Sequence, residues 1–463
     1  MKDSIVRIQK IELINFKNVK NGIIEFKNNT NNSEEYIPSS EILGVYGQNG
    51  SGKTALVNAC NFFKSLLEGL PFPNDAYNYI NIYSNEATVK IELYMNVQKE
   101  EYIVNYEFSF KKVDDKKVVI CKEKLGCSKK ENGLWNSKVT LIDYDIENKE
   151  EIFLPKYRYS EILTNNKENI VNLKVAQRLA IDKNASFIFS NEVKSIFLNA
   201  KQQKDINIIL ETLTYFARCN LFVIMNDHTG IISMNVLMPL SFRLEEKEQI
   251  TSGDILVGLG GVSVVSKPAF EILNLIINQM NVVLKYIVPS LQIELFNYGE
   301  QHDENGNQGI KVELLSVKDK AKLPIKYESE GIKKIISILS ALIAMYNNPS
   351  ICMVVDELDS GIYEFLLGEM LKVIEKGGKG QLIFTSHNLR PLEILSKESL
   401  YFTTTNTENR YIRFSNVKPN NNLRSLYIRS INLGGQKEEL YEETNSIEIQ
   451  RAFRLAGEKF DAI

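Results

Sequence analysis

The stretch Gly47-Gln48-Asn49-Gly50-Ser51-Gly52-Lys53-Thr54 decides how the rest of the chain is interpreted. It fits G-x-x-x-x-G-K-[ST], the pattern of a loop that cradles nucleotide phosphates. An apolar, strand-like run at 42–46 precedes it, and residues 55–63 carry apolar side chains at helical spacing. The sequence therefore predicts a strand, a glycine-rich loop and a helix, in the order that this pattern needs.

The chemistry expected of this loop follows from its residue types. Glycines let successive backbone N–H groups turn inward as an anion nest, and a helix N-terminus adds a positive dipole end. Lys53 is expected to reach the β- and γ-phosphates, and the Thr54 hydroxyl is expected to bind Mg²⁺. We therefore predict an ATP and Mg²⁺ site at residues 47–54 rather than a chance glycine–serine loop.

A second half of the site is expected much later in the chain. The apolar run 350–355 ends in Asp356 and Glu357, which is the Walker B pattern. A buried strand places such acids at its carboxyl end, where ligands lie in open α/β sheets. Asp356 is expected to hold Mg²⁺ directly or through water, and Glu357 to polarise the attacking water as general base. A third apolar run, 381–386, is followed by His387, one of only three histidines.

Composition is that of an ordinary globular protein and excludes some classes of function. The 463 residues correspond to about three domains, and the net charge of −3 argues against a protein that coats nucleic acid. Five cysteines without a C-x-x-C pair favour reduced thiols over disulfides or zinc. The N-terminus lacks a signal-peptide core and no apolar run approaches the ~20 residues of a membrane span, so we expect a cytoplasmic protein without membrane contact.

Alternating residues predict strands on both sides of the phosphate loop. Residues 5–15 and 22–26 predict two strands, which are separated by Phe16-Lys17-Asn18. Four further runs predict an antiparallel meander with one solvated face: 87–96, 101–110, 118–121 and 139–142.

The segment from Lys111 to Lys130 holds eight lysines against three acids. Two interpretations are open. The lysines could form a patch that faces nucleic-acid phosphates, or they could line a solvated hairpin edge and guard it against aggregation. The second interpretation is the favoured one.

Helical spacing dominates residues 150–345, for example at 192–218 and 268–284. Within this region, residues 291–296 and 310–315 alternate and predict a hairpin.

Residues 327–334, Tyr-Glu-Ser-Glu-Gly-Ile-Lys-Lys, open an apolar helix at 335–343. Serine and glycine at a helix start can make a second anion site, although an N-cap alone is the simpler interpretation. Together with the phosphate loop, the Walker B strand and His387, this set resembles the head of ABC-type ATPases over residues 5–64 and about 325–400. The opening strands with Asn-Phe-Lys and the Ser-Glu-Gly helix start resemble the SMC, RecF and OLD branch, especially stand-alone ATPase subunits of prokaryotic phage-defence systems.

The resemblance implies the fold class and the roles of further residues. The fold is expected to be α/β, an ABC-type P-loop ATPase head with a mixed sheet, an antiparallel meander and a large, mainly helical inserted lobe. Ser329 and Gly331 take the places of the serine and second glycine of the Leu-Ser-Gly-Gly-Gln signature. They would complete the ATP site of a second protomer, which implies a homodimer or larger homo-oligomer. Leu433-Gly434-Gly435-Gln436 matches the letters of this signature more closely. It follows His387, however, whereas the family's order of motifs places the signature before the Walker B strand.

The resemblance also makes His387 the H-loop residue that contacts the γ-phosphate, and Lys17 a candidate phosphate contact. The catalytic set is then Lys53, Glu357 and His387. Two departures from the family pattern remain. Tyr363 ends the segment where relatives usually carry Asp or His, and no Q-loop glutamine can be placed.

Four segments follow from these assignments. They are an N-terminal part of the ATPase head (1–149), a mainly helical lobe that ends in the signature helix (150–347), a C-terminal part of the head (348–436) and a tail helix (437–463). In the tail, an apolar stripe recurs at helical spacing: Ile449, Ala452, Phe453 and Ala456. It predicts a helix that packs on its own head or, alternatively, one that docks a partner.

The expected function is a Mg²⁺-dependent ATPase that acts as a nucleotide-switched sensor or regulator in anti-phage defence and controls a separate effector, a nuclease or toxin. The alternative is a RecF- or SMC-like DNA-repair or DNA-binding ATPase, so nucleic acid stays an open partner. A transporter subunit is disfavoured by the long inserted region and the degenerate signature. An intrinsic nuclease is disfavoured because too few residues follow His387 for such a domain.

Overall fold

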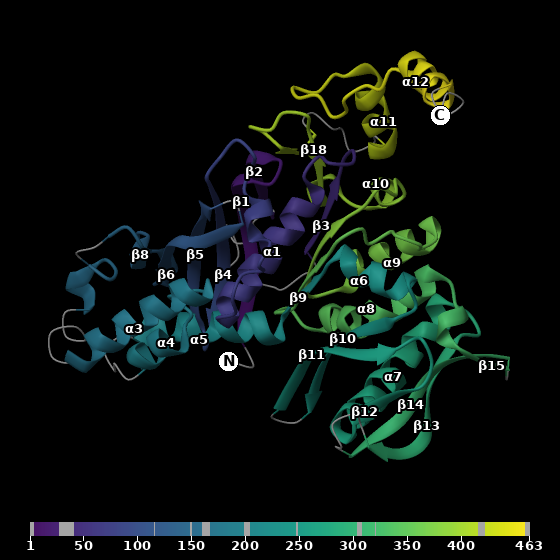
Figure 1. Ribbon diagram of the computed structural model, residues 1–463, viewed down its shortest axis with the longest axis horizontal. Coiled ribbons are helices and arrows are strands. Elements are labelled where there is room, and N and C mark those ends of the chain that lie inside the picture. Colours follow the sequence, from purple (N-terminus) through teal and green to yellow (C-terminus); the bar gives the residue numbers. More distant parts are fainter. Residues whose placement is uncertain are drawn as a thin grey trace.

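The computed structural model describes residues 4–26, 41–114, 116–148, 151–159, 167–198, 204–246, 249–302, 308–319, 321–414 and 422–458. In this part of the chain, two large sheets pack on either side of helix α1 (Lys53–Glu68) (Figure 1). A smaller sheet and a hairpin lie below the central sheet in the same view.

The central sheet has six strands in the order β19-β18-β3-β17-β16-β9. They are β3 (Glu41–Tyr46), β9 (Leu221–Ile224), β16 (Cys352–Val355), β17 (Gln381–Thr385), β18 (Leu400–Thr403) and β19 (Tyr411–Ile412). All neighbouring strands are parallel except β18 and β19. The three strands predicted around the phosphate loop, the two acids and His387 are thus neighbours, and their carboxyl ends meet at one edge.

Both faces of this sheet are buried, because successive side chains of a strand point to opposite faces. Leu43 and Val45 pack with α1 and the second large sheet, whereas Ile42 and Tyr46 pack with helices on the other face. Those helices are α8 (Glu330–Asn347) and α9 (Glu364–Gly377). Burial on both sides explains why these strands are almost continuously apolar.

The predicted antiparallel meander is confirmed as the second large sheet, in the order β2-β1-β4-β5-β6-β7 with β8 on β6. Its strands are β1 (Ile5–Phe16), β2 (Val19–Glu25), β4 (Glu86–Val97), β5 (Glu100–Asp114), β6 (Lys117–Glu131), β7 (Leu134–Trp135) and β8 (Val139–Asp145). Aromatic rings join it to α1: the ring of Phe62 lies 5.7 Å from that of Phe110 and 5.8 Å from that of Phe16.

The range 150–347 differs from the single, mainly helical lobe that the sequence predicts. Its helices are α3 (Lys167–Lys183), α4 (Asn191–Leu198), α5 (Lys204–Cys219), α6 (Asn226–Ser233), α7 (Lys267–Ile287) and α8. However, β9 from the middle of this range pairs with β16 and belongs to the central sheet. The range is therefore not separate from the ATPase head.

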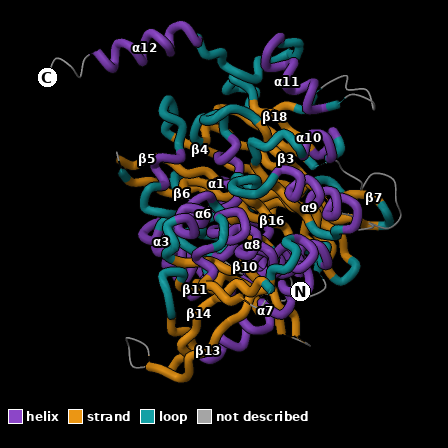
Figure 2. The backbone as a smooth tube through the Cα atoms, turned by 90° about the vertical axis from the view of Figure 1, so that its right-hand side faces the viewer, coloured by secondary structure: helices purple, strands orange, loops and turns teal. Residues whose placement is uncertain are grey.

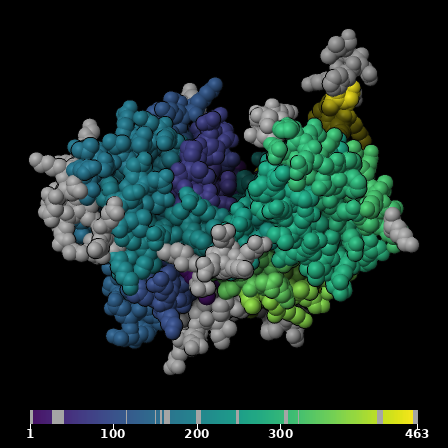
Figure 3. Space-filling model, turned by 90° about the horizontal axis from the view of Figure 1, so that it is seen from below, coloured from purple at the N-terminus to yellow at the C-terminus, as the bar shows by residue number. Residues whose placement is uncertain are grey.

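The same range also contains six strands below the central sheet. They are β10 (Leu237–Glu246), β11 (Gln249–Gly258), β12 (Ser263–Ser266), β13 (Gln292–His302), β14 (Gln308–Lys318) and β15 (Ala321–Pro324). The predicted hairpin is present as β13 and β14, and its tip, 303–307, lies outside the described residues. Figure 3 shows residues of this region in green at one end of the molecule, with the blue residues of the meander at the other.

Helices α10 (Pro391–Ile394), α11 (Leu423–Leu433) and α12 (Ser446–Glu458) complete the C-terminal part. The chain before α12 is fixed to the head, because the Thr405 amide donates to the Glu439 carbonyl at 2.8 Å and Leu440 is buried. Helix α12 itself extends away from the body, and residues 446–457 are all exposed (Figure 2). The sequence leaves two alternatives for the tail helix, and the structure does not contain the first, in which the helix packs on its own head. Among the described helices, none has the length and apolarity to cross a membrane.

Candidate nucleotide-binding and hydrolysis site

The phosphate loop connects β3 to α1, as predicted. The structure explains why two positions of the loop are occupied by glycine. Gly52 caps α1 with a φ of 100°, a left-handed conformation that side chains disfavour. A Cβ on Gly47 would lie only 1.6 Å from the Thr403 hydroxyl oxygen, so a side chain has no room there. The loop therefore needs glycine at both its first and its last turn.

Lys53 is buried at the start of α1 and its ammonium lies against the loop. Nζ donates to the Gly47 carbonyl at 2.8 Å and to the Gln48 carbonyl at 2.9 Å. Burial lowers the pKa of Lys53, while the carboxylates of Asp356, Glu357 and Asp359 oppose this shift. The ammonium is thus placed between the loop and the acids at the end of β16.

Thr54 and Asp356, the two predicted Mg²⁺ ligands, come together although they are far apart in sequence. Thr54 Oγ1 and Asp356 Oδ1 are 3.5 Å apart. The Thr385 hydroxyl, at the end of β17, donates to Asp356 Oδ1 at 2.6 Å and accepts from the Glu357 amide at 2.7 Å. A hydroxyl and a buried carboxylate are hard oxygen donors, the type of ligand that Mg²⁺ prefers.

His387 follows β17 at the same edge, and its backbone is fixed by Asp359. Asp359 Oδ2 accepts from the amides of His387 and Asn388 at 3.1 Å and 2.9 Å. Burial lowers the pKa of the His387 imidazole, and the nearby Lys53 cation lowers it further. The imidazole is therefore neutral at pH 7 and can accept or donate a hydrogen bond.

Lys17 lies at the turn between β1 and β2 with a positive φ of 52°. Its Nζ donates to Asn58 Oδ1 at 2.6 Å and lies 4.5 Å from the centre of the Tyr79 ring. Burial lowers the pKa of Lys17, whereas the carboxylate of Asp356 opposes the shift. The structure thus brings this residue to the same cleft as the phosphate loop.

These groups surround one cleft of about 280 Å³. It is lined by Lys17, Asn18, Asn49, Gly50, Gly52, Lys53, Thr54, Ala55, Glu357 and His387. Two lysines and the N-terminal end of α1 favour an anion there, and the oxygen ligands beside them favour a divalent cation. The residues present therefore fit a nucleotide with Mg²⁺.

Ser329 and Gly331 are not among the residues that line this cleft. Ser329 is the N-cap of α8, accepting from the Ile332 amide at 3.4 Å, and it is exposed. Gly331 packs on the loop after β16, since a Cβ there would lie 1.9 Å from the Gly361 carbonyl oxygen. Tyr363, in the same loop, is 69% exposed. The signature residues therefore lie outside the cleft of their own chain.

The sequence alone does not single out several residues that shape the loop. The Asn18 side-chain amide donates to the Gly50 carbonyl, the Tyr411 hydroxyl donates to the Gly52 carbonyl at 2.7 Å, and the Thr403 hydroxyl lies 2.5 Å from that of Ser51. Asn18 adjoins Lys17 in a stretch that the sequence does mark. The other two come from strands β18 and β19, which carry no motif, so only folding identifies them.

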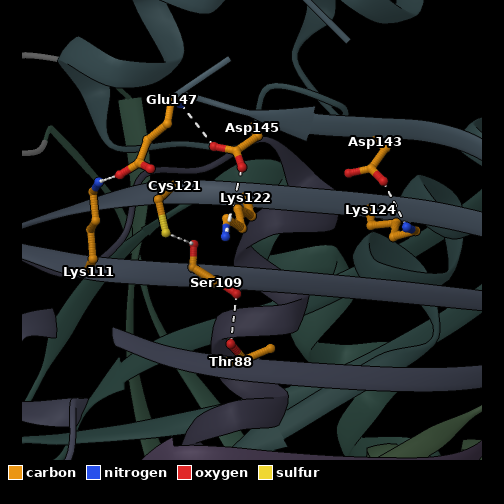
Figure 4. Close-up of polar contacts among 9 residues, drawn as sticks. All are labelled: Thr88, Ser109, Lys111, Cys121, Lys122, Lys124, Asp143, Asp145 and Glu147. Atoms are coloured by element: carbon orange, nitrogen blue, oxygen red, sulfur yellow. Dashed lines mark hydrogen bonds and ion pairs between the residues drawn. The ribbon is translucent and has the colours of Figure 1, made fainter. Parts of the chain in front are cut away.

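Five of the eight lysines in the segment 111–130 pair with acids of the meander, of the turn after it or of α5. Lys124 lies 2.7 Å from Asp143, Lys122 lies 3.8 Å from Asp145, and Lys111 pairs with Glu147 (Figure 4). Lys129 and Lys130 also have acidic partners, Asp205 and Glu101. These pairs favour the solvated sheet edge over a patch for nucleic-acid phosphates.

Comparison with known proteins gives one family match. The model of the AAA domain family matches residues 10–256, and no curated protein matches the sequence. Among solved structures, the Smc head domain of Pyrococcus furiosus bound to the C-terminal domain of ScpA is 13% identical, with a TM-score of 0.40 over 89% of this chain and 97% of that chain. The SMC head domain from Thermotoga maritima has 13% identity and a TM-score of 0.37, over 88% and 99%. The recombination mediator RecF has 13% identity and a TM-score of 0.37, over 89% and 98%.

The family match covers more than half of the chain and includes the phosphate loop, the meander and β9. The predicted α/β P-loop ATPase fold, with its mixed sheet and antiparallel meander, is confirmed. The chain belongs to the AAA domain family of ATPases.

Proposed function

We propose that this chain is a Mg²⁺-dependent ABC-type ATPase that regulates a separate effector protein in anti-phage defence. The observation that carries the enzymatic part is the cleft in which the phosphate loop, the acids after β16 and His387 meet. Lys53 and the loop amides bind and orient the phosphates, and Thr54 with Asp356 holds the metal ion. When bound, Mg²⁺ neutralises charge that develops on the phosphates.

In this proposal Glu357 is the general base, because its side chain lines the cleft next to the metal ligands. Glu357→Gln keeps the shape and loses the base, so we expect ATP binding to persist while kcat falls by about 10²-fold or more. Lys53→Ala is expected to weaken ATP binding itself. Steady-state hydrolysis and equilibrium binding of ATP by the purified variants are the measurements. Unchanged hydrolysis in Glu357→Gln would remove Glu357 from this role.

We further propose that two protomers share their ATP sites. The exposed Ser329 at the N-terminus of α8, away from its own cleft, supports this arrangement. Glu357→Gln should form dimers that increase with ATP, and adding Ser329→Arg should abolish that increase. Ser195→Arg, on the exposed surface of α4, is a matched control that should not. Light scattering measures the mass. ATP-independent monomers in every variant would contradict the shared site.

The regulatory part of the proposal rests on the tail. Helix α12 presents Ile449 and Phe453 at exposed fractions of 45% and 77%, on one stripe with the exposed Ala452 and Ala456. An exposed apolar helix face is a common docking element for a partner with a hydrophobic groove. The alternative, a RecF- or SMC-like DNA-binding ATPase, predicts ATP-dependent retardation of DNA by the purified chain. The paired lysines of the meander give that alternative no support.

A further inference from the structure

Helix α8 carries two consecutive buried lysines, and their ammonium groups donate to different partners. Lys333 is 3% exposed and its Nζ donates to Asn235 Oδ1 at 2.7 Å. Lys334 is 2% exposed and its Nζ donates to the backbone carbonyl of Glu357. A buried ammonium is costly unless it is well partnered, so a lysine at either position calls for a specific role.

The partner of Lys334 has an unusual backbone. Glu357 has a φ of 47°, in the left-handed region that non-glycine residues rarely adopt. Its amide donates to the Thr385 hydroxyl at 2.7 Å, and the next amide, of Leu358, donates to the Thr385 carbonyl at 3.0 Å. The Glu357 carbonyl accepts from two donors, Lys334 Nζ and the Ser360 amide, the latter at 2.9 Å. The disfavoured turn that aims Glu357 into the cleft is thus held from β17 on one side and from α8 on the other.

Electrostatics agree with a retained cation at this position. Burial lowers the pKa of Lys334 to about 8, and the carboxylates of Asp359, Glu357 and Asp356 oppose that shift. The ammonium therefore stays charged near pH 7, where a charged donor makes a stronger hydrogen bond to a carbonyl than a neutral one.

The position of Lys334 on α8 also connects it to the signature. Ser329 caps this helix and Gly331 packs on Gly361, so the first turn of α8 contacts the loop that follows β16. Lys334, one turn later on the same helix, contacts the start of that loop. A displacement of α8 relative to the central sheet would therefore move the carbonyl of Glu357.

We propose that Lys334 is a positioning residue that couples the signature helix α8 to the carboxylate of Glu357. It acts through the Glu357 backbone and does not itself contact the nucleotide. The inference rests on the proposed ATP hydrolysis and extends it, since it explains how contact at Ser329 would influence the general base in the same chain.

The test compares Lys334→Met with Lys333→Met in the full-length protein. Methionine keeps the length of the buried side chain and removes its charge, and each variant loses one buried hydrogen bond, so their losses of stability are comparable. For Lys334→Met we expect kcat to fall at least about tenfold, KM for ATP to stay within about twofold, and the urea midpoint measured without nucleotide to fall no further than that of Lys333→Met. Lys333→Met should keep kcat near the wild-type value. Lys334→Gln, too short to make the same contact, is the second variant if Lys334→Met is insoluble, with the same expected loss of kcat.

The possible results separate this inference from the proposed function. If the wild-type protein does not hydrolyse ATP, both fail. If the wild type is active and both Lys334 variants match it in kcat, only the positioning role fails. A loss of kcat that follows a lowered urea midpoint, to the same extent in the Lys333 and Lys334 variants, would make Lys334 a merely structural residue and would also overturn the inference.

Discussion

At the scale of single residues, the two acids after β16 lie in different positions because the backbone turns between them. In a continuing strand, Asp356 and Glu357 would point to opposite faces of the sheet. With a φ of 47° at Glu357, Asp356 lies buried beside Thr54 while Glu357 lines the cleft. The sequence marks both acids as candidates. It does not reveal the turn, because a glutamate in the left-handed region has no characteristic neighbours in sequence.

His387 gives a prediction on pH dependence at this scale. Burial and the Lys53 cation lower the pKa of His387 below its usual value, so the unfolded state binds a proton more readily than the folded state. Stability is therefore expected to rise with pH in the window between the folded-state pKa and the usual value near 6.5, and to fall on acidification through that window. We expect His387→Gln to weaken this dependence, measured by urea unfolding without nucleotide between about pH 5.5 and about pH 7.5.

The matched control for the loss of a histidine is His228→Gln, on α6 and not among the residues that line the cleft. Wild type and control should share one pH profile, and His387→Gln should depart from it at the acid end. If the stability of the wild type and of both variants followed the same pH profile, the prediction would be refuted, because the buried imidazole of His387 would then contribute nothing to the pH dependence of stability.

At the scale of elements, periodicity locates most of the strands and helices near the site, but not all of them. The meander strands alternate clearly because one of their faces is solvated, α1 follows the glycine motif, and α8 begins at a serine N-cap. Strand β9 is a run of only four apolar residues, Leu221-Phe222-Val223-Ile224, directly after α5. Such a short run cannot be distinguished from the end of a buried helix by its periodicity. For that reason the sequence places it in a helical lobe.

The contact between α8 and the loop after β16 leads to a stability prediction. A Cβ on Gly331 would lie 1.9 Å from the Gly361 carbonyl oxygen, so Gly331→Ala must push the helix start away from this loop. We expect a loss of about 1–3 kcal/mol in the free energy of unfolding, as for other overpacked sites, from urea titration.

A matched control for this substitution is Gly230→Ala in α6, where a Cβ would meet no atom within 4 Å. Because alanine is the better helix former, this variant should be neutral or more stable by up to about 1 kcal/mol. If both substitutions had the same effect on the unfolding free energy, the close approach of Gly331 to Gly361 would have no energetic consequence.

At the scale of the whole molecule, the site is assembled from segments more than 300 residues apart, such as Thr54 and Asp356. Each of these two segments carries a recognisable motif, so the sequence alone predicts that they lie together in the site. The surroundings of α12 could not be predicted in this way, since a helical stripe reveals an apolar face but not what covers it. In the structure this face is uncovered, and the segment before the helix is tied to the phosphate loop through the Glu442 amide, which donates to Gln48 Oε1 at 3.0 Å. A partner bound to α12 would therefore be attached close to the nucleotide.

The last prediction tests that attachment. Ile449→Glu with Phe453→Glu places two charges on the apolar stripe, one helical turn apart. Gln450→Glu with Arg454→Gln has the same spacing and the same change in net charge, but lies on another face of α12.

Because α12 is exposed, both variants should keep wild-type ATPase activity and unfolding midpoints. When the gene next to this one is co-expressed as the source of the proposed effector, we expect only the stripe variant to lose protection against phage and to stop co-purifying with that gene's product. The purified chain alone should leave DNA and RNA intact with Mg²⁺ or Mn²⁺. Equal protection by the two variants would exclude α12 as the docking element. Cleavage by this chain alone, abolished by a point mutation within it, would overturn the separate effector itself.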